Sequence, residues 1–249
     1  MVAGFVMLPQ ILYGMLCGLV AGSFLATLVL RWPRGETLGQ RSHCDGCGRQ
    51  LRALELVPLL SFAALGGHSR CCGTPIDWRH PALELAAALI GGLAMLAAPG
   101  GAGLAGALLG WLLLALVALD SEHYWLPDRI TLSLLALGLL LGQGSLATRL
   151  SGAALAGGGL LLLLHCYRRL RRRDGLGLGD VKLGAALGAW FGPWLLGPLL
   201  LTAALFGIGL ALLSGRIRAS TTEARIPFGA CLAVAAFPFW LYVHASSGF

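Results

Sequence analysis

The chain has 249 residues, of which 57% are hydrophobic and only 12% are charged, and its formal net charge is +7. Soluble globular domains carry about 25% charged residues, so this composition argues against a soluble domain. The basic excess needs no nucleic-acid partner, because the basic residues flank apolar runs, where membrane topology and attraction to anionic lipid account for them.

Apolar runs close to the length that crosses a bilayer core, about 20 helical residues, recur along the chain. Helices satisfy the backbone hydrogen bonds inside lipid, and no strand pattern of period two is visible. We therefore expect an all-α polytopic membrane protein with about eight transmembrane helices, at 4–30, 81–98, 102–119, 129–143, 151–167, 181–196, 197–214 and 227–245. The sixth and seventh are separated at the Gly and Pro residues of "GPWLLGP".

The predicted parts are a first transmembrane helix (1–30), a cysteine-containing polar domain (31–80) and a membrane-embedded domain (81–249). The first run is too long for a signal peptide and has no basic residue before it. Of the 18 basic residues, all but Arg149 fall in or beside alternate loops, including 168–180 and 215–226. The positive-inside rule puts those loops and the 31–80 domain in the cytoplasm and both chain ends outside.

The 31–80 domain is small for an independent core, and such domains often need a metal or a disulfide. In a reducing compartment a thiolate–zinc site is the usual alternative to a disulfide. "CDGCG" supplies Cys44 and Cys47, and "SRCCG" repeats the pattern with Ser69 in place of its first cysteine. Zinc takes four ligands, so Cys72 is the third candidate. Cys71 is the leading candidate for the fourth, and His68, His43 and water are the alternatives. A degraded site that folds without metal is the alternative.

Three further cysteines stand alone in apolar runs, and we interpret them as small core residues: Cys17, Cys166 and Cys231.

Two acids stand at the cytoplasmic ends of predicted spans, Asp120 in "ALDSEHYWLPD" and Asp180 in "GLGLGDVKLG". Their spans run in the same direction at those ends, so the carboxylates lie at similar depth. If the helices pack together, the two groups can share one proton, which is the chemistry of aspartic proteases. Gly177 and Gly179 would let an extended substrate backbone approach Asp180 closely, and we assign them with Lys182 to the active-site loop.

Simpler interpretations compete with this one. Asp180 could cap a helix that begins at Val181, and Asp128 could cap the helix that begins at Arg129. Lys182 would then contact lipid phosphate, while Glu84 could pair with an arginine. At the level of function, the rivals are a membrane transporter that uses Asp120 and Asp180 as a proton relay and a non-enzymatic zinc-bearing scaffold.

The motifs together resemble those of the type IV prepilin peptidases, membrane aspartic proteases of the type IV pilus and type II secretion systems. The likeness runs through "AGSFLATLVLRWPRG", the cysteine domain up to "RHPALEL", "LVALDSEHYWLPD" and the G-x-G-D stretch in "GLGLGDVKLGAALGAWFG". It implies that Asp120 and Asp180 are the catalytic pair. Ala26 and Ser69 depart from the family pattern, where asparagine and cysteine are common.

The resemblance also implies a function and a cellular location. The enzyme would cut the basic leader from prepilins or pseudopilins after a glycine, on the cytoplasmic face of the bacterial inner membrane. It would then methylate the new N-terminus with S-adenosylmethionine. Cofactor-binding residues are not assigned, since no G-x-G-x-x-G follows a strand, and the oligomeric state is not predicted.

Overall fold

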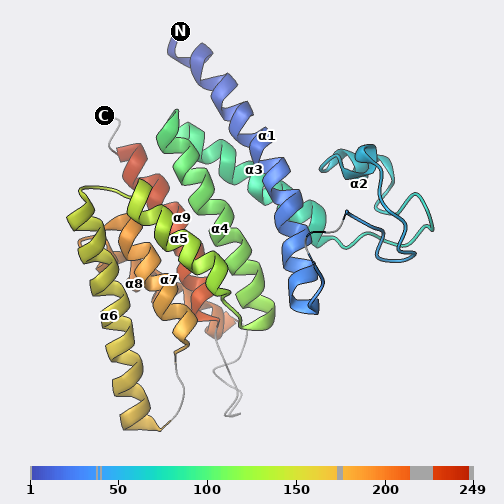
Figure 1. Ribbon diagram of the computed structural model, residues 1–249. Helices are drawn as coiled ribbons and strands as arrows, with labels where there is room; N and C mark the ends of the chain where they lie inside the picture. Colours follow the sequence, from blue (N-terminus) through green and yellow to red (C-terminus); the bar gives the residue numbers. More distant parts are fainter. Residues whose placement is uncertain (1, 38, 40, 173–175, 214–226, 247–249) are drawn as a thin grey trace. The chain divides into compact units, whose positions relative to one another are not determined.

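The structure is a computed structural model that describes residues 2–37, 39, 41–172, 176–213 and 227–246 (Figure 1). The chain divides into two compact units, Met1–Ala115 with His244–Phe249, and Leu116–Val243. The described residues form helices and loops and contain no strand. The all-α membrane fold expected from the sequence is therefore confirmed.

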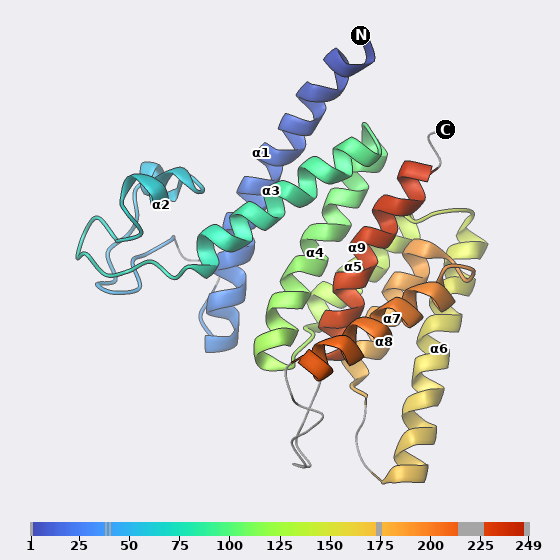
Figure 2. The same cartoon turned by 180° about the vertical axis from the view of Figure 1, so that it is seen from behind.

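In the first unit, α1 (Val2–Arg31) and α3 (Arg79–Ala97) lie side by side in both views (Figures 1 and 2). Glycines on every fourth residue of α1 face α3, and a Cβ on Gly18 would collide with the carbonyl oxygen of Ala87. Gly14 and Gly91 meet backbone to backbone in the same way. Small residues allow this close approach, which is how helices associate in lipid without a hydrophobic driving force.

The segment between α1 and α3 is built from turns. It holds the 3₁₀ helices Trp32–Arg34 and Ala53–Leu56, the short helix α2 (Leu60–Ala64) and two isolated antiparallel bridges. Its Leu59 N–H donates a 2.8 Å hydrogen bond to Oε2 of Glu84, a buried residue in the second turn of α3. The predicted arginine partner of Glu84 is thus replaced by a backbone N–H, which anchors the segment to the start of α3.

The second unit contains the last turns of α4 (Gly101–His123), and the helices after it are α5 (Asp128–Leu141), α6 (Leu146–Arg171), α7 (Leu178–Phe191), α8 (Leu196–Leu213) and α9 (Phe228–Ser246). α7 is buried along most of its length and packs against α5 and α6 (Figure 2). Gly188 of α7 meets the backbone of Gly152 in α6. On the α5 side, Nε1 of Trp190 donates to the carbonyl oxygen of Leu134 at 2.9 Å.

The expected count of eight spanning helices is not confirmed. Six of the described helices are long and apolar enough to cross a membrane: α1, α3, α4, α6, α8 and α9. α5 and α7 occur where the fourth and sixth spans were expected but have 14 residues each, about 21 Å of helix against a core of about 30 Å. α7 ends at Phe191, earlier than predicted, because Gly192 takes a left-handed φ of 71°. The predicted 215–226 loop lies outside the described residues.

Candidate active site and metal centre

Asp120 and Asp180 lie in the second unit and are both buried, with 5% and 9% of their surface exposed. Asp120 belongs to the last turn of α4 and Asp180 to the first turn of α7. A Cβ added to Gly229 would stand 3.0 Å from Oδ2 of Asp120 and 3.0 Å from Oδ1 of Asp180. The two oxygens are therefore no more than twice that distance apart, and they face each other across a glycine.

Backbone N–H groups at two helix starts hold the carboxylates. Ala230, in the first turn of α9, donates to Oδ2 of Asp120 at 2.7 Å. Gly177, which precedes α7, donates to Oδ2 of Asp180 at 2.9 Å. The positive end of a helix dipole favours negative charge, so both helix starts offset part of the repulsion between the two acids.

The capping interpretation of Asp180 is correct only in part. α7 begins at Leu178 rather than Val181, and Gly177 occupies the N-cap position. Asp180 is the third residue of the helix, and its carboxylate reaches back to the Gly177 N–H. The same side chain therefore stabilises the helix start and faces Asp120.

The other predicted active-site residues take different positions. Gly179 packs against Leu126, where an added Cβ would stand 2.9 Å from the leucine Cβ, so this glycine lets the start of α7 approach the loop between α4 and α5. Lys182 forms a 2.6 Å ion pair with Asp128 rather than contacting lipid phosphate. Asp128 is the first residue of α5. The N-cap position of this helix is held by Pro127, and no side chain makes a capping hydrogen bond there. The predicted cap at Asp128 is therefore wrong.

Sequence reasoning missed Gly229 and Ala230. They follow Phe228 in "IPFGACL", at the start of the last apolar run. A glycine at the beginning of a helix is common, and only the folded chain brings this one to acids far away in sequence.

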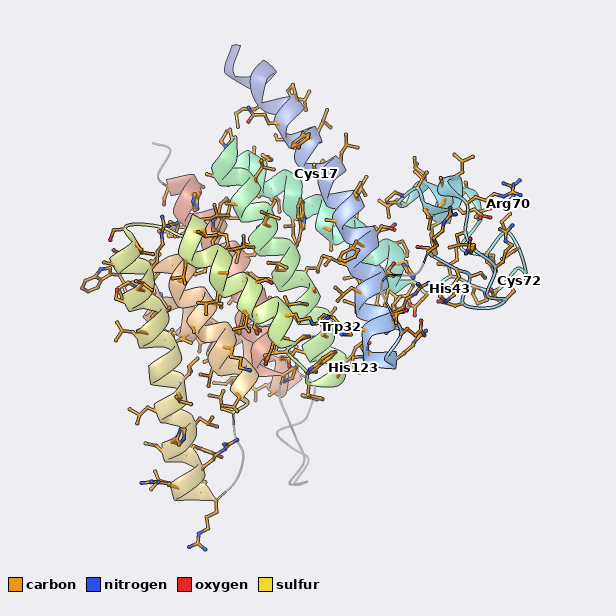
Figure 3. The ribbon with its side chains drawn as sticks, viewed as in Figure 1. Cys17, Trp32, His43, Arg70, Cys72 and His123 are labelled. Carbon is orange, nitrogen blue, oxygen red and sulfur yellow. The ribbon has the colours of Figure 1, made fainter. Side chains whose placement is uncertain are left out.

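Four cysteine sulfurs in the first unit lie within 4.8 Å of one another, those of Cys44, Cys47, Cys71 and Cys72. Neighbouring sulfurs are 3.6 Å apart for Cys44 and Cys72 and 3.3 Å apart for Cys47 and Cys71. Four thiolates around a tetrahedral zinc, each with a Zn–S bond of about 2.3 Å, stand about 3.8 Å from one another. The donor set and spacing fit such an ion. Figure 3 shows Cys72 on the loops beyond α1.

The two cysteine motifs form matching turns. Gly48 donates to the carbonyl oxygen of Cys44 and Gly73 to that of Ser69, and both glycines have a left-handed φ, of 72° and 71°. When the two turns are aligned, Ser69 corresponds to Cys44 and Cys71 corresponds to Gly46. Cys71 thereby brings the fourth sulfur to the cluster.

Groups around the cluster favour the thiolate form of Cys44 and Cys72, whereas at Cys47 the lowering effect of the Arg49 N–H is outweighed by hydrogen bonds with the neighbouring cysteine sulfurs, which raise its pKa. The Ser69 hydroxyl shares a hydrogen bond of 3.2 Å with the Cys72 sulfur. Burial alone would raise the pKa of Cys44, but the backbone N–H groups of Cys47 and Gly46 lower it to about 5. His68, a predicted alternative ligand, is instead hydrogen-bonded through Nδ1 to the carbonyl oxygen of Gly66 at 2.8 Å.

The isolated cysteines lie apart from this cluster. Cys231 is buried as expected, while Cys17 is half-buried and Cys166 is exposed on α6. The predicted core position of Cys166 is therefore wrong, because none of the residues that the structure describes packs over this face of α6.

Comparisons with known proteins agree with the resemblance seen in the sequence. A family model described as the bacterial peptidase A24 N-terminal domain matches residues 16–98, and the model of the type IV leader peptidase family matches residues 107–212. No solved structure matches the chain significantly.

Several curated relatives carry the name prepilin leader peptidase/N-methyltransferase. The one from Burkholderia pseudomallei (strain 1026b) is 38% identical over 93% of this chain and 86% of its own length. Those from Aeromonas hydrophila and Pseudomonas aeruginosa are 42% and 36% identical, over 78% and 92% of this chain and 69% and 89% of their own length. Identity at this level over most of both chains shows the family. The chain thus belongs to the type IV leader peptidase family and is a multi-pass membrane peptidase.

Proposed function

We propose that the chain is an aspartic endopeptidase that removes the leader from type IV prepilins or type II secretion pseudopilins, with Asp120 and Asp180 as its catalytic pair. One observation carries the assignment: two buried carboxylates from different helices face each other across Gly229. The relatives named prepilin leader peptidase/N-methyltransferase support the substrate class.

Two carboxyl groups this close cannot both ionise easily, so one keeps a proton. The ionised group takes a proton from water, and the water oxygen attacks the scissile carbonyl carbon. The protonated group donates its proton to the carbonyl oxygen. The C–N bond then breaks and its nitrogen takes up a proton, so one water is consumed and a new N-terminal amine is released.

A second step is proposed for that amine, its methylation with S-adenosylmethionine. When bound, the cofactor supplies the methyl group: the amine lone pair forms the N–C bond, the S–C bond breaks toward sulfur, and the surplus proton leaves the nitrogen to water. The relatives' printed name supports this step. Zinc on the four cysteines is proposed to be structural, because the turns between α1 and α3 bury little apolar surface of their own.

The proposed orientation places both chain ends outside and the 31–80 segment in the cytoplasm of a bacterial inner-membrane protein. It rests on the basic residues, which include Arg168, Arg169 and Arg171 in the last turn of α6. An impermeant thiol reagent should leave Cys44 and Cys47 unlabelled in intact cells, and once a chelator has removed the zinc it should label them in inverted vesicles. Labelling of these cysteines in intact cells would show that the 31–80 segment lies outside and that the orientation is the reverse of the one proposed.

The rival transporter is not supported, since the matched family and the named relatives are peptidases.

The decisive assay incubates the purified protein with a prepilin and follows the intact mass of the product. Asp120→Asn and Asp180→Asn should each lower the cleavage rate at least about 10²-fold, since one shared-proton partner is then missing. Glu36→Gln, the same carboxyl-to-amide change in the first unit, should cleave normally. Near-normal cleavage by either aspartate variant would remove that residue from the catalytic pair.

A further inference from the structure

Residues 53–64 of the first unit, the apolar segment, place hydrocarbon side chains on the outside of the molecule. Every exposed residue in this segment is apolar: Ala53, Leu54, Leu56, Leu60, Ala63 and Ala64. Leu54 is 80% exposed and Leu60 is 70% exposed. Single exposed leucines are ordinary, but a run of them on one short stretch marks an interaction surface.

The apolar segment has an inner and an outer face. Glu55 and Ser61 lie on the inner face, where they line a cavity of about 150 Å³ in the first unit. The Ser61 hydroxyl donates to the carbonyl oxygen of Val57 at 2.8 Å. Leu54 and Leu60 are not part of the cavity lining. The segment therefore turns its polar groups inward and presents hydrocarbon on its outer face, which is the pattern of an interfacial segment.

The depth of the segment follows from its attachment to α3. This helix has 19 residues, or about 28 Å of length against a bilayer core of about 30 Å, so it crosses only if nearly all of it lies inside. Glu84 follows Arg79, the first residue of α3, by about 8 Å along the helix axis. The Leu59 N–H donates to Oε2 of Glu84 at 2.8 Å. The apolar segment is thus held below the end of a spanning helix, at the boundary between headgroups and acyl chains.

Figures 1 and 2 agree with this depth. In both views α2, which ends the apolar segment, stands at the height of α1 and not beyond its last turn. A water-filled position away from the bilayer would place α2 past the ends of the two spanning helices.

The residues beside the segment suit the same position. Trp78 directly precedes α3 and is 71% exposed. Its indole N–H makes no hydrogen bond with any residue that the structure describes. Tryptophan is enriched at membrane interfaces, where its ring meets acyl chains and its N–H meets lipid oxygens. Arg52, exposed at the start of the segment, brings a positive charge to the level of the lipid phosphates.

We propose that the apolar segment and Trp78 form a membrane-surface anchor, whose outer face enters the leaflet at which α3 begins. Lipid is the favoured occupant because the surface is fixed to a spanning helix at a depth where lipid surrounds the protein. Interfacial segments insert about 5–10 Å, which matches the depth set by Glu84. The anchor holds the cysteine turns against the membrane between α1 and α3. This inference does not depend on the proposed cleavage reaction.

The test uses the full-length protein in vesicles of phosphatidylethanolamine and phosphatidylglycerol. A small share of the lipid carries a photoactivatable diazirine on the upper part of one acyl chain, and the labelled peptides are identified by mass spectrometry. Residues 53–64 should take up label at a level close to that of α1 and α3, while the second cysteine turn, 66–75, should stay near background. Label in 53–64 no higher than in 66–75 would overturn the proposal. Cross-links from this segment to a second protein chain in place of lipid would overturn it too.

A double variant tests the side chains themselves. Leu54→Asp combined with Leu60→Asp should lower the labelling of residues 53–64 at least about threefold, because carboxylates draw the outer face toward water. Unchanged labelling of α1 and α3 would show that the variant is still inserted. Leu170→Asp, the same change at an exposed leucine in the last turn of α6, should leave the labelling of 53–64 unaltered. Wild-type labelling of 53–64 in the inserted double variant would show that these leucines do not anchor the segment.

Discussion

Asp120 accepts a 2.7 Å hydrogen bond from the backbone N–H of Ala230, although the two residues lie 110 positions apart in the chain. The bond joins the last turn of α4 to the first turn of α9. It also sets Gly229 between the two carboxylates, so the geometry of the pair depends on a residue that has no side chain and no acid–base chemistry.

Gly229→Ala should therefore abolish most of the cleavage. The new Cβ would stand 2.5 Å from Cδ1 of Leu126 and 3.0 Å from an oxygen of each aspartate, which forces the pair apart. A misplacement of about 1 Å at reacting groups costs about 10²-fold in rate, so the smaller shift forced here should lower the rate by about tenfold. The rate of prepilin cleavage by the purified variant checks it.

The control is Gly209→Ala in α8, where an added Cβ meets nothing within 4 Å. This variant should cleave at the wild-type rate. If Gly229→Ala did so too, the carboxylates would not need the close approach that the glycine allows.

The metal centre gives a second prediction. The purified wild type should hold about one zinc, and Cys47→Ser and Cys71→Ser should each lower that content, because each removes one of four thiolate ligands. Ser69→Ala should retain the metal, since its hydroxyl hydrogen-bonds the Cys72 sulfur and the Thr74 hydroxyl but is not one of the four ligands. Metal analysis of preparations made without chelators decides this.

Cleavage should fall less in the cysteine variants than in Asp180→Asn, since the catalytic pair lies in other helices. A wild type with well under about half an equivalent of zinc would reject the site. Ser69 would then mark a site already lost.

The contact between α1 and α3 predicts a stability effect. Gly18→Ala places a methyl group against the carbonyl oxygen of Ala87, and overpacking of this kind costs about 1–3 kcal/mol. Thermal unfolding in detergent should show a lower midpoint. Gly158→Ala in α6, where a Cβ would meet open space, is the matched change and should leave the midpoint unchanged or raise it. Equal midpoints for the two variants would mean that α1 and α3 do not pack through their glycines.

The sequence predicted the helices and the two aspartates because hydrophobic length and the position of an acid at the end of a span are local properties. It did not predict Gly229 and Ala230, whose role depends on the packing of α9 against α4 and α7. The short length of α5 was predicted to within two residues at its end, but the end of α7 was not, because the apolar run continues past Gly192, where the backbone leaves the helix.

The cysteine cluster shows the same limit. The repeated "CG" turns pointed to Cys44, Cys47 and Cys72 and made Cys71 the leading fourth candidate, but only the register of the second turn removes the histidine alternative. Division of the chain at residues 30 and 80 stays a prediction.

The ion pair between Lys182 and Asp128 joins α7 to α5 just beyond the catalytic pair. The lysine side chain is 39% exposed and the aspartate side chain 61%, so water and salt screen their attraction. Such pairs contribute about 0.2–1 kcal/mol to the free energy of unfolding. A double-mutant cycle of Lys182→Met and Asp128→Asn on that free energy should give a coupling energy in the same range.

Each of the two variants should change the cleavage rate by less than about tenfold, because Lys182 does not reach the catalytic pair and the Gly177 N–H still holds Asp180. The measurement is the cleavage rate at low and high salt. A loss as large as that of Asp180→Asn would show that Lys182 acts on the substrate or on the catalytic pair, and its place in the active-site loop would then be chemical rather than structural.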